Sequence, residues 1–303
     1  MDHPLYQQAS QLIDRSGLGS KAWQLKRFLK PAIRMESSPA SAFPLPPGTS
    51  KLGGLPDLSS VLAWPTWRDV PMVFLAQIQL CELAPYDMEQ LLPTRGFLYF
   101  FCQSQDLFQG CDTKVWDYID PQEPESWKVL FFDGERAELQ ATSVPDGLAE
   151  IALLPDCALH FGAALTLPPF ESSLIASLNL EDEEEEQYMN LLGTFATVFL
   201  GAGDNIYHNH QLLGYPHQIQ SDMQHLCQLY SLCVTPHWAG LDEEMKKASI
   251  ESGVLEWVHL LQIDTDEYAQ VTWGEVGSFS YFIKQADLKR RDFEGCWAIE
   301  DSL

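Results

Sequence analysis

Hydrophobic residues recur in short runs through the middle of the chain, between Gly54 and Leu174. Five runs are rich in aromatic and β-branched residues: PMVFLAQIQL (71–80), GFLYFFCQ (96–103), KVLFFDG (128–134), EIALLP (150–155) and LHFGAALTLP (159–168). Pro, Gly, Asp and Gln separate them, and apolar runs bounded by turn residues are typical of β-strands. VLEWVHLLQID (254–264) and GSFSYFIK (277–284) predict two more strands near the C-terminus.

Elsewhere the apolar residues stand three and four positions apart, which predicts helices. This spacing covers residues 5–29, 181–200, 221–233 and 241–252. The second of these segments begins with six consecutive acidic residues, EDEEEE, which are favourable at the positive end of a helix dipole. We therefore interpret the acidic run as the solvated start of a helix, with a surface for a basic partner as the alternative.

A set of short motifs occurs twice in the same order. Leu-x-Gly-x-Pro stands at Leu52, Gly54 and Pro56, and again at Leu212, Gly214 and Pro216. Gln77-Ile78 is then matched by Gln262-Ile263, FLYF (97–100) by FSYF (279–282), and Asp106-Leu107 by Asp287-Leu288. The order predicts two similar β-rich halves, about 33–178 and 179–303. Because each half alone buries little surface, we expect the halves to share one core, with a cleft between them as the first place to look for a ligand.

Several of these stretches together closely resemble the YwqG-like family, a bacterial domain of unknown function. The resemblance is carried by SKLGGLPDL, Trp64-Pro65, PMVFLAQIQL, GFLYFF, QLLGYPHQIQSDM and WGEVGSFSYFIKQADLKRRDF, and it runs from Ile33 to Trp297. It implies an α+β fold with a mostly antiparallel, roll-like sheet built from two similar halves and with several peripheral helices. Residues 1–32 form an N-terminal helical extension to a single domain over 33–303. The resemblance also implies that some members are intracellular interaction or immunity proteins paired with secreted toxins.

The net charge of the chain indicates which kinds of partner it can bind. Its 303 residues include 18 basic and 43 acidic ones, a formal net charge of −25. Such a surface repels nucleic acids and anionic membranes and attracts basic proteins or cations. We therefore expect no nucleic-acid and no membrane partner, and a basic protein as the partner to test.

The seven cysteines indicate where the protein works. Their number is odd, none forms C-x-x-C, and most lie inside apolar runs such as LYFFCQ and LPDCALHF. They are typical of buried, reduced thiols. The N-terminus lacks the pattern of a signal peptide, and no run reaches the ~18 apolar residues that span a bilayer. These features predict a cytoplasmic protein.

One histidine-rich segment, HNHQLLGYPHQIQSDMQH, supplies candidate metal ligands. His208, His210 and His217 lie near one another in the sequence, and Asp264 is a carboxylate that could join them. The spacing matches neither H-E-x-x-H nor a zinc finger. Asp264 also opens a stretch that begins like a calcium loop, but Ala269 stands where an EF-hand needs glycine. A polar surface segment is the simpler interpretation.

Two further sets of residues are candidates for binding. Gln77 and Gln262 are amides inside apolar strands at matching positions, and each must find hydrogen-bond partners. We expect each to hold the backbone of a nearby loop, such as the Leu-x-Gly-x-Pro turn of its own half. Trp64, Trp67 and Trp273 flank turns, where tryptophan serves either as an interface anchor or as packing beneath a loop.

Catalytic signatures are missing from the sequence. It contains no P-loop, no G-x-G-x-x-G and no G-x-S-x-G. The leading hypothesis is therefore a non-enzymatic protein without a cofactor that binds a basic protein, such as a toxin. The alternative is a metal- or small-ligand-binding protein, or a metal-dependent hydrolase, that uses the cleft between the halves.

Overall fold

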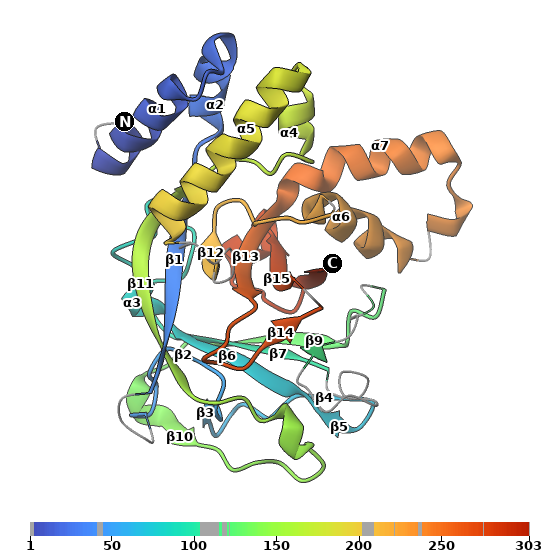
Figure 1. Ribbon diagram of the computed structural model, residues 1–303. Coiled ribbons are helices and arrows are strands. Elements are labelled where there is room, and N and C mark those ends of the chain that lie inside the picture. Colours follow the sequence, from blue (N-terminus) through green and yellow to red (C-terminus); the bar gives the residue numbers. More distant parts are fainter. Residues whose placement is uncertain are drawn as a thin grey trace.

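A computed structural model describes residues 3–40, 45–103, 115–116, 120, 122–201, 209–220, 222–235, 238–274 and 276–302. The fold is α+β, with a large antiparallel sheet that curls into a nearly barrel-like roll and with helices on its outside (Figure 1). Of the described residues, ten strands belong to this sheet, in the order β16-β15-β13-β12-β1-β11-β2-β6-β7-β9. The predicted fold class is therefore confirmed.

Two long strands form the centre of the sheet. β1 (Lys30–Pro39) pairs with β11 (Cys157–Thr166) along its whole length, from Lys30 opposite Thr166 to Pro39 opposite Cys157. In Figure 1 the two strands run side by side and join the helices at one end to the lower strands at the other. β1 was not among the predicted strands, because its sequence KPAIRMESSP is half polar.

Shorter strands flank this centre on both sides in a matching order. On one side lie β2 (Lys51–Leu52), β6 (Val73–Gln79), β7 (Phe97–Cys102) and β9 (Trp127–Phe132). On the other lie β12 (Gln211–Leu213), β13 (Trp257–Asp264), β15 (Gly277–Lys284) and β16 (Trp297–Ser302). Leu52 and Leu212, the two Gln-Ile pairs and the two aromatic motifs thus stand on strands at equal distances from the centre.

The register of the ladders corrects one detail of the motif alignment. β6 has a bulge between Phe74 and Ala76, and β13 has one between His259 and Leu261, so the two bulges stand at matching places. Counted from the glutamines, Gln77 lies opposite Tyr99, whereas Gln262 lies opposite Ser280. FLYF and FSYF are therefore offset by one residue in space, because the ladder and not the letters sets the correspondence.

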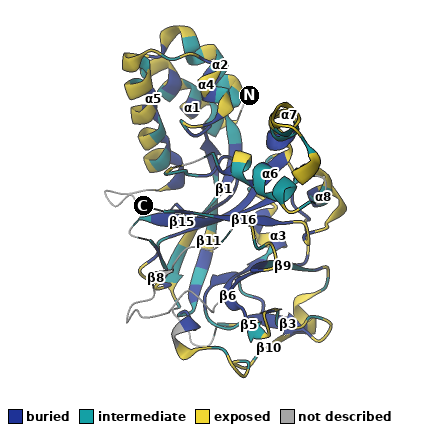
Figure 2. Cartoon of the chain, turned by 90° about the vertical axis from the view of Figure 1, so that its right-hand side faces the viewer, coloured by how far each residue is buried: buried dark blue, intermediate teal, exposed yellow. Residues whose placement is uncertain are grey.

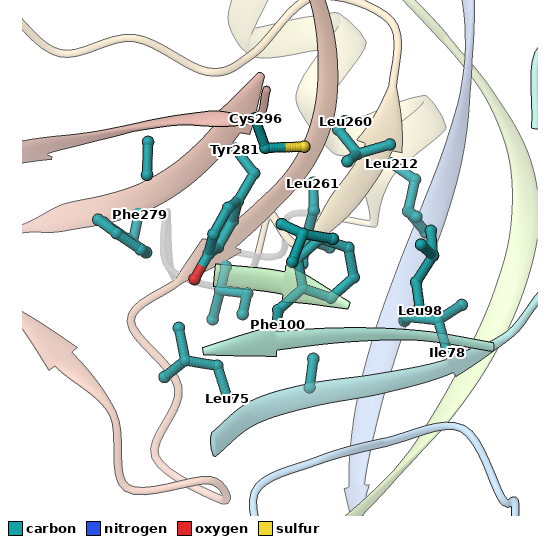
Figure 3. Close-up of a cluster of buried hydrophobic side chains, with 14 of the residues drawn as sticks. Leu75, Ile78, Leu98, Phe100, Leu212, Leu260, Leu261, Phe279, Tyr281 and Cys296 are labelled. Atoms are coloured by element: carbon teal, nitrogen blue, oxygen red, sulfur yellow. The ribbon is translucent and has the colours of Figure 1, made fainter. Parts of the chain in front are cut away.

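One hydrophobic core joins the two sides of the sheet. The rings of Phe100 on β7 and Tyr281 on β15 pack with centroids 5.1 Å apart, and the Tyr281 hydroxyl donates to the Phe101 carbonyl at 2.9 Å. Figure 3 shows side chains from both sides pointing toward one another, with Leu75, Leu98 and Phe100 below and Leu212, Leu260 and Leu261 above. Side chains thus fill the space between these strands, so a pocket between the two halves has to lie outside this core.

The two edges of the sheet also approach each other. Trp127 on β9 lies edge-on against Trp297 on β16, with ring centroids 5.5 Å apart. Its indole N–H donates to the carbonyl of Cys296 at 3.0 Å. The ring contact and the hydrogen bond join the two edge strands, which do not pair with each other in the ladder.

A helical layer covers one end of the central strands. It consists of α1 (Pro4–Arg15), α2 (Ala22–Phe28), α4 (Ser173–Ala176) and α5 (Asp182–Phe195), which continues as a π-helical turn over Ala196–Leu200. Ile13, Leu25, Tyr188 and Phe195 pack with Leu165 of β11 in a second core, while the outer faces of these helices are exposed (Figure 2). The predicted boundary between residues 32 and 33 falls inside β1.

Smaller elements complete the molecule. α6 (Met223–Cys233) and α7 (Glu243–Gly253) lie outside the second set of strands; α3 (Leu80–Leu83) follows β6, and α8 (Gln285–Arg290) follows β15. Short ladders join β3 (Asp57–Ser59) to β10 (Leu139–Ala141), β4 (Thr66–Trp67) to β5 (Val70–Pro71), and β8 (Val115–Trp116) to β14 (Thr272–Trp273). Across the described ranges, no helix combines the length and the apolar character needed to cross a bilayer.

One predicted strand is wrong. The run EIALLP forms a short 3₁₀ helix over Glu150–Ala152, and the next strand begins only at Cys157. Pro155 has no N–H to give to a ladder, and the carbonyl of Leu154 accepts the N–H of Gly54. The run therefore supports the first glycine turn and adds no strand to the sheet.

Candidate functional site

The first Leu-x-Gly-x-Pro turn is held from beneath by a buried amide. Gln77 on β6 accepts the N–H of Asp57, the residue after Pro56, at 2.7 Å. The same amide donates to the carbonyl of Thr49 at 3.0 Å and to the carboxylate of Asp57 at 3.1 Å. Both ends of the Gln77 side chain are therefore used to fix the turn on the sheet.

The second turn is held in the same way, but by one end of its amide. Gln262 on β13 accepts the N–H of His217, the residue after Pro216, at 2.9 Å. Its NH₂ group is buried and has no hydrogen-bond partner among the described residues. In both turns the N–H of the residue after the proline therefore donates to a buried glutamine. In the second turn the NH₂ group of that glutamine, Gln262, makes no hydrogen bond to the described residues.

Of the candidate metal ligands, His210 and Asp264 meet, but through the backbone. His210 is buried, and its Nδ1 accepts the N–H of Asp264 at 2.9 Å. A nitrogen that accepts carries no proton, so Nε2 bears the hydrogen and donates to the carboxylate of Asp266 at 2.8 Å. Both nitrogens of His210 are occupied by the protein itself.

Asp266 also binds a third segment of the chain. The hydroxyl of Ser37 on β1 donates to the same carboxylate oxygen as His210, and the N–H of Ala269 donates to the other at 2.8 Å. Burial by itself would raise the pKa of Asp266, but the hydrogen bonds donated by His210, Ser37 and Ala269 hold it below its ordinary value. The carboxylate therefore stays ionised and fastens β1 to the turn after β13.

The matching place in the first half performs the same task with a serine. The Ser50 hydroxyl accepts the N–H of Gln79 at 2.9 Å and donates to the carboxylate of Glu82 at 2.6 Å. His210 stands where Ser50 stands relative to the turn, and it likewise accepts a backbone N–H and donates to a carboxylate. We conclude that His210 has a structural role.

The remaining metal candidates do not complete a site. The carboxylate of Asp264 accepts the N–H groups of Asn209 and Thr265 at 3.0 and 2.8 Å. His217 lies half-buried on the second turn, and His208 lies outside the described residues, as does the repeat motif Asp106-Leu107. Within the part of the chain that the structure describes, no three His, Cys, Asp or Glu side chains are placed to hold a metal ion.

The predicted tryptophans differ in exposure. Trp67 and Trp273 are buried, with 6% and 0% of their surface exposed. Trp64 is half-buried, and its indole donates to the carbonyl of Met72 at 2.9 Å while its ring meets Phe101. Trp67 and Trp273 thus pack inside the fold and offer no ring face to a partner.

Beneath the first turn, a buried lysine forms ion pairs with two carboxylates. Lys51 on β2 is buried, and its Nζ lies 3.8 Å from Asp57 and 3.5 Å from Asp156. Lys51 lies opposite Gln77 in the ladder, and the matching position opposite Gln262 is Gln211. A buried lysine with two carboxylates is therefore replaced in the second half by an uncharged amide.

Beneath the second turn, several polar groups are buried without protein partners. They are Oε1 of Gln211, Nε2 of His259, Nε2 of Gln262 and the hydroxyls of Ser278 and Ser280, and we call this set the polar face. His259 donates from Nδ1 to the carbonyl of Leu213 at 3.0 Å, and burial lowers its pKa to about 4. At the matching positions the first half holds the ion-paired Lys51 and the rings of Phe74, Phe97 and Tyr99, and Gln77 makes the hydrogen bonds that the NH₂ group of Gln262 lacks among the described residues, so the two halves differ here.

A pocket with a volume of about 410 Å³ opens beside the second turn, and we call it the α5 pocket. One wall is α5 and its π-helical turn, through Met189, Leu192, Gly193, Ala196 and Thr197. The other walls are the end of β11 with the following loop, residues 165–171, and the turn residues 215–219. Single π-helical turns within helices are often found at functional sites.

The spacing of apolar residues within 181–200 predicts that Leu192 is buried on one face of the helix together with Tyr188 and Phe195. In the structure Leu192 is half-buried in the pocket wall, next to Met189, which is 51% exposed. The signal was an apolar stripe too wide for one buried face, continued by the small residue Gly193. No local pattern could show that residues 165–171 and 215–219 complete the pocket.

Carboxylates gather around the α5 pocket, and the Lys30 ammonium packs over the ring of the lining residue Tyr215, 4.4 Å from its centroid. Glu171 is exposed in its wall, and none of the described lining residues is lysine or arginine. Glu185 and Glu186 are exposed one turn before Met189 on the same helix, so their side chains neighbour it. The pocket therefore combines an apolar wall with an acidic rim.

Comparison with known proteins identifies a family but no activity. A family model described as a domain of unknown function (DUF1963) matches residues 50–301, which is most of the chain. The match begins at the first Leu-x-Gly-x-Pro turn and includes β16, so both turns and the polar face lie within it. No curated protein matches the chain.

Proposed function

The chain belongs to the family of the domain of unknown function DUF1963, and within it we propose that this protein is a YwqG-like cytoplasmic binding protein that holds a basic protein partner. The observation that carries the proposal is the exposed acidic start of α5, Asp182–Glu186, next to an apolar pocket with an acidic rim. The net charge of −25 supports it, because it steers a basic partner toward the surface. A toxin neutralised by binding is one such partner, as the family resemblance implies.

The two halves are part of this proposal. We interpret them as one unit written twice, in which the shared hydrogen bonds of Gln77 and Gln262 are scaffold. The differences between the halves, the polar face and the α5 pocket, are then the places where a binding function has been added. The strand order, symmetric about β1 and β11, supports this interpretation.

A pull-down from native cell extract tests the proposal at low and at moderate salt. We expect the recovered protein to be basic, to bind again after purification, and to be retained less well at the higher salt. The matched variant replaces Glu183, Glu185 and Glu186 by Gln and keeps Glu181 and Glu184, whose side chains cap the helix. Recovery of no basic protein at either salt, or equal retention by this variant, would count against the proposal.

A small ligand is the second candidate, and the volume of the α5 pocket favours it. About 410 Å³ falls within the ~300–1,000 Å³ of typical small-molecule sites. Thermal shifts with a fragment library would reveal such a ligand, and Gly193→Phe in the pocket wall should abolish them. The metal-dependent version predicts stoichiometric bound metal, so a metal assay of the purified protein decides it.

A further inference from the structure

The α5 pocket has the features of a docking site for one side chain of a larger molecule. Its helical wall is apolar at Leu192 and Ala196, and Met189 stands at its edge with half of its surface in solvent. A large apolar residue exposed beside a pocket is typical of an interaction site. The other walls come from the second turn, which Gln262 holds in place.

The acidic residues at the rim of the pocket favour a ligand with positive charge. Glu171 lies in the wall, and Glu185 and Glu186 stand one helical turn from Met189. Glu186 and Met189 are three residues apart and Glu185 and Met189 four, so all three share one face of α5. The described lining residues include no lysine or arginine. The three carboxylates beside the pocket therefore complement a positively charged segment.

From this geometry we propose that the α5 pocket receives an apolar anchor residue of a basic polypeptide, whose flanking lysines or arginines pair with Glu171, Glu185 and Glu186. This inference rests on the proposed function and assigns its binding site. The anchor supplies affinity by leaving water, and the rim charges supply orientation and fast association.

Selection from a random peptide library on the full-length protein tests the assignment. The library is enriched on the wild-type chain and counter-screened on Gly193→Phe, in which an aromatic ring occupies the pocket. Gly193 suits this change because a Cβ there meets no atom within 4 Å. Gly240→Phe is the matched control, since its Cβ also meets open space and the residue lies outside the pocket. Circular dichroism and melting temperature confirm that both variants are folded.

We expect the enriched peptides to carry one large apolar residue between lysines or arginines. Their affinity should fall by about tenfold or more on Gly193→Phe, as loss of a buried side chain predicts, and stay within about twofold on Gly240→Phe. Glu185→Gln with Glu186→Gln should reduce the salt dependence of binding. The same pair of changes at Glu243 and Glu244, exposed in the first turn of α7, should leave it unchanged.

The outcomes separate the two proposals. Basic peptides that bind Gly193→Phe as tightly as wild type would overturn the pocket assignment and leave the proposed function standing. Enrichment of neutral or acidic peptides would overturn both. Dimerisation of the wild-type chain that Gly193→Phe abolishes would assign the pocket to a second copy and equally overturn the inference.

Discussion

Gly53 and Gly54 carry the chain through two successive left-handed conformations, with φ of +65° and +70°. A Cβ on Gly53 would lie 2.1 Å from the carbonyl oxygen of Pro155, which is backbone and cannot move aside. Leu213 and Gly214 repeat the two left-handed steps in the second half, with φ of +60° and +69°. Because a leucine strains to adopt this conformation, the second turn stores energy that the first avoids.

The first prediction concerns Gly53→Ala. The added Cβ is strained at this left-handed φ and meets a backbone oxygen, so we expect a loss of roughly 3 kcal/mol in the free energy of unfolding. Gly19→Ala is the control, because no atom lies within 4 Å of its Cβ position, and it should change stability by less than about 0.5 kcal/mol. Urea denaturation measures both. Equal stability of the two variants would contradict the strain argument.

The second prediction compares the two buried glutamines. Gln77→Leu removes three hydrogen bonds and leaves the N–H of Asp57 and the carbonyl of Thr49 without that partner, so it should cost about 2–3 kcal/mol. Gln262→Leu removes one bond and also an amide group that has no partner, so it should cost about 1 kcal/mol. A larger loss for Gln262→Leu in urea denaturation would show that its NH₂ group is engaged.

At the scale of elements, β6 and β13 differ at one ring. Phe74 packs on Phe101 with centroids 5.4 Å apart, and His259 packs on Phe282 at 5.3 Å, in matching ladder positions. The histidine thus occupies an aromatic place in a strand, where burial lowers its pKa to about 4. The neutral imidazole packs on Phe282 as an aromatic ring and also donates a hydrogen bond to the carbonyl of Leu213.

This substitution predicts sensitivity to acid. The unfolded chain takes up a proton on His259 near its ordinary pKa of about 6.5, whereas the folded chain does so only near 4. The contribution of neutral His259 to the free energy of unfolding is therefore fully present above pH 6.5. It declines as the pH falls toward 4, by roughly 3 kcal/mol in all. His259→Phe should lose about 1 kcal/mol at pH 7 with the hydrogen bond to Leu213, and should lack this decline.

Urea denaturation of both proteins between pH 4 and 7 measures the difference. The carboxylates titrate in the wild type and in the variant alike, so the difference in stability isolates the histidine. Parallel curves for the two proteins would show that His259 becomes protonated in the folded state as readily as in the unfolded one.

The same elements show why some of the fold was predictable. Strands β6 and β7 are nearly continuous apolar runs and β15 is rich in aromatic residues, so VFLAQIQ, FLYFFC and GSFSYFIK each predict a strand locally. β1 alternates apolar and polar residues only weakly, and it is a strand because β11 and β12 lie on either side of it. Such pairing over long sequence separations leaves no local trace.

Some parts of the candidate site could be predicted from local sequence, and others could not. An amide inside an apolar strand signalled that Gln77 and Gln262 hold backbone nearby. The histidine cluster suggested a metal, but His210 is occupied by Asp264 and Asp266. The α5 pocket could not be predicted, because three segments that are distant in sequence form its walls.

At the scale of the whole molecule, a net charge of −25 acts on every contact. Like charges on one surface repel, and the compact state brings them closest together. Salt should therefore stabilise the folded protein, and the gain should level off once the Debye length falls below about 10 Å, near 0.1 M. Melting temperatures from ~10 mM to ~0.5 M sodium chloride measure the effect. A melting temperature that falls with salt would mean that attractive ion pairs dominate.

The central position of β1 has a consequence for synthesis of the protein. The ribosome completes this strand at Pro39, but its partners β11 and β12 begin only at Cys157 and Gln211. A nascent chain therefore carries a ten-residue strand with two unpaired edges until both partners have been made. Strands β6, β7 and β9 precede β11 and can pair with one another first, so the centre of the sheet closes late, and α1 and α2, which are made before β1, can shield that strand until then.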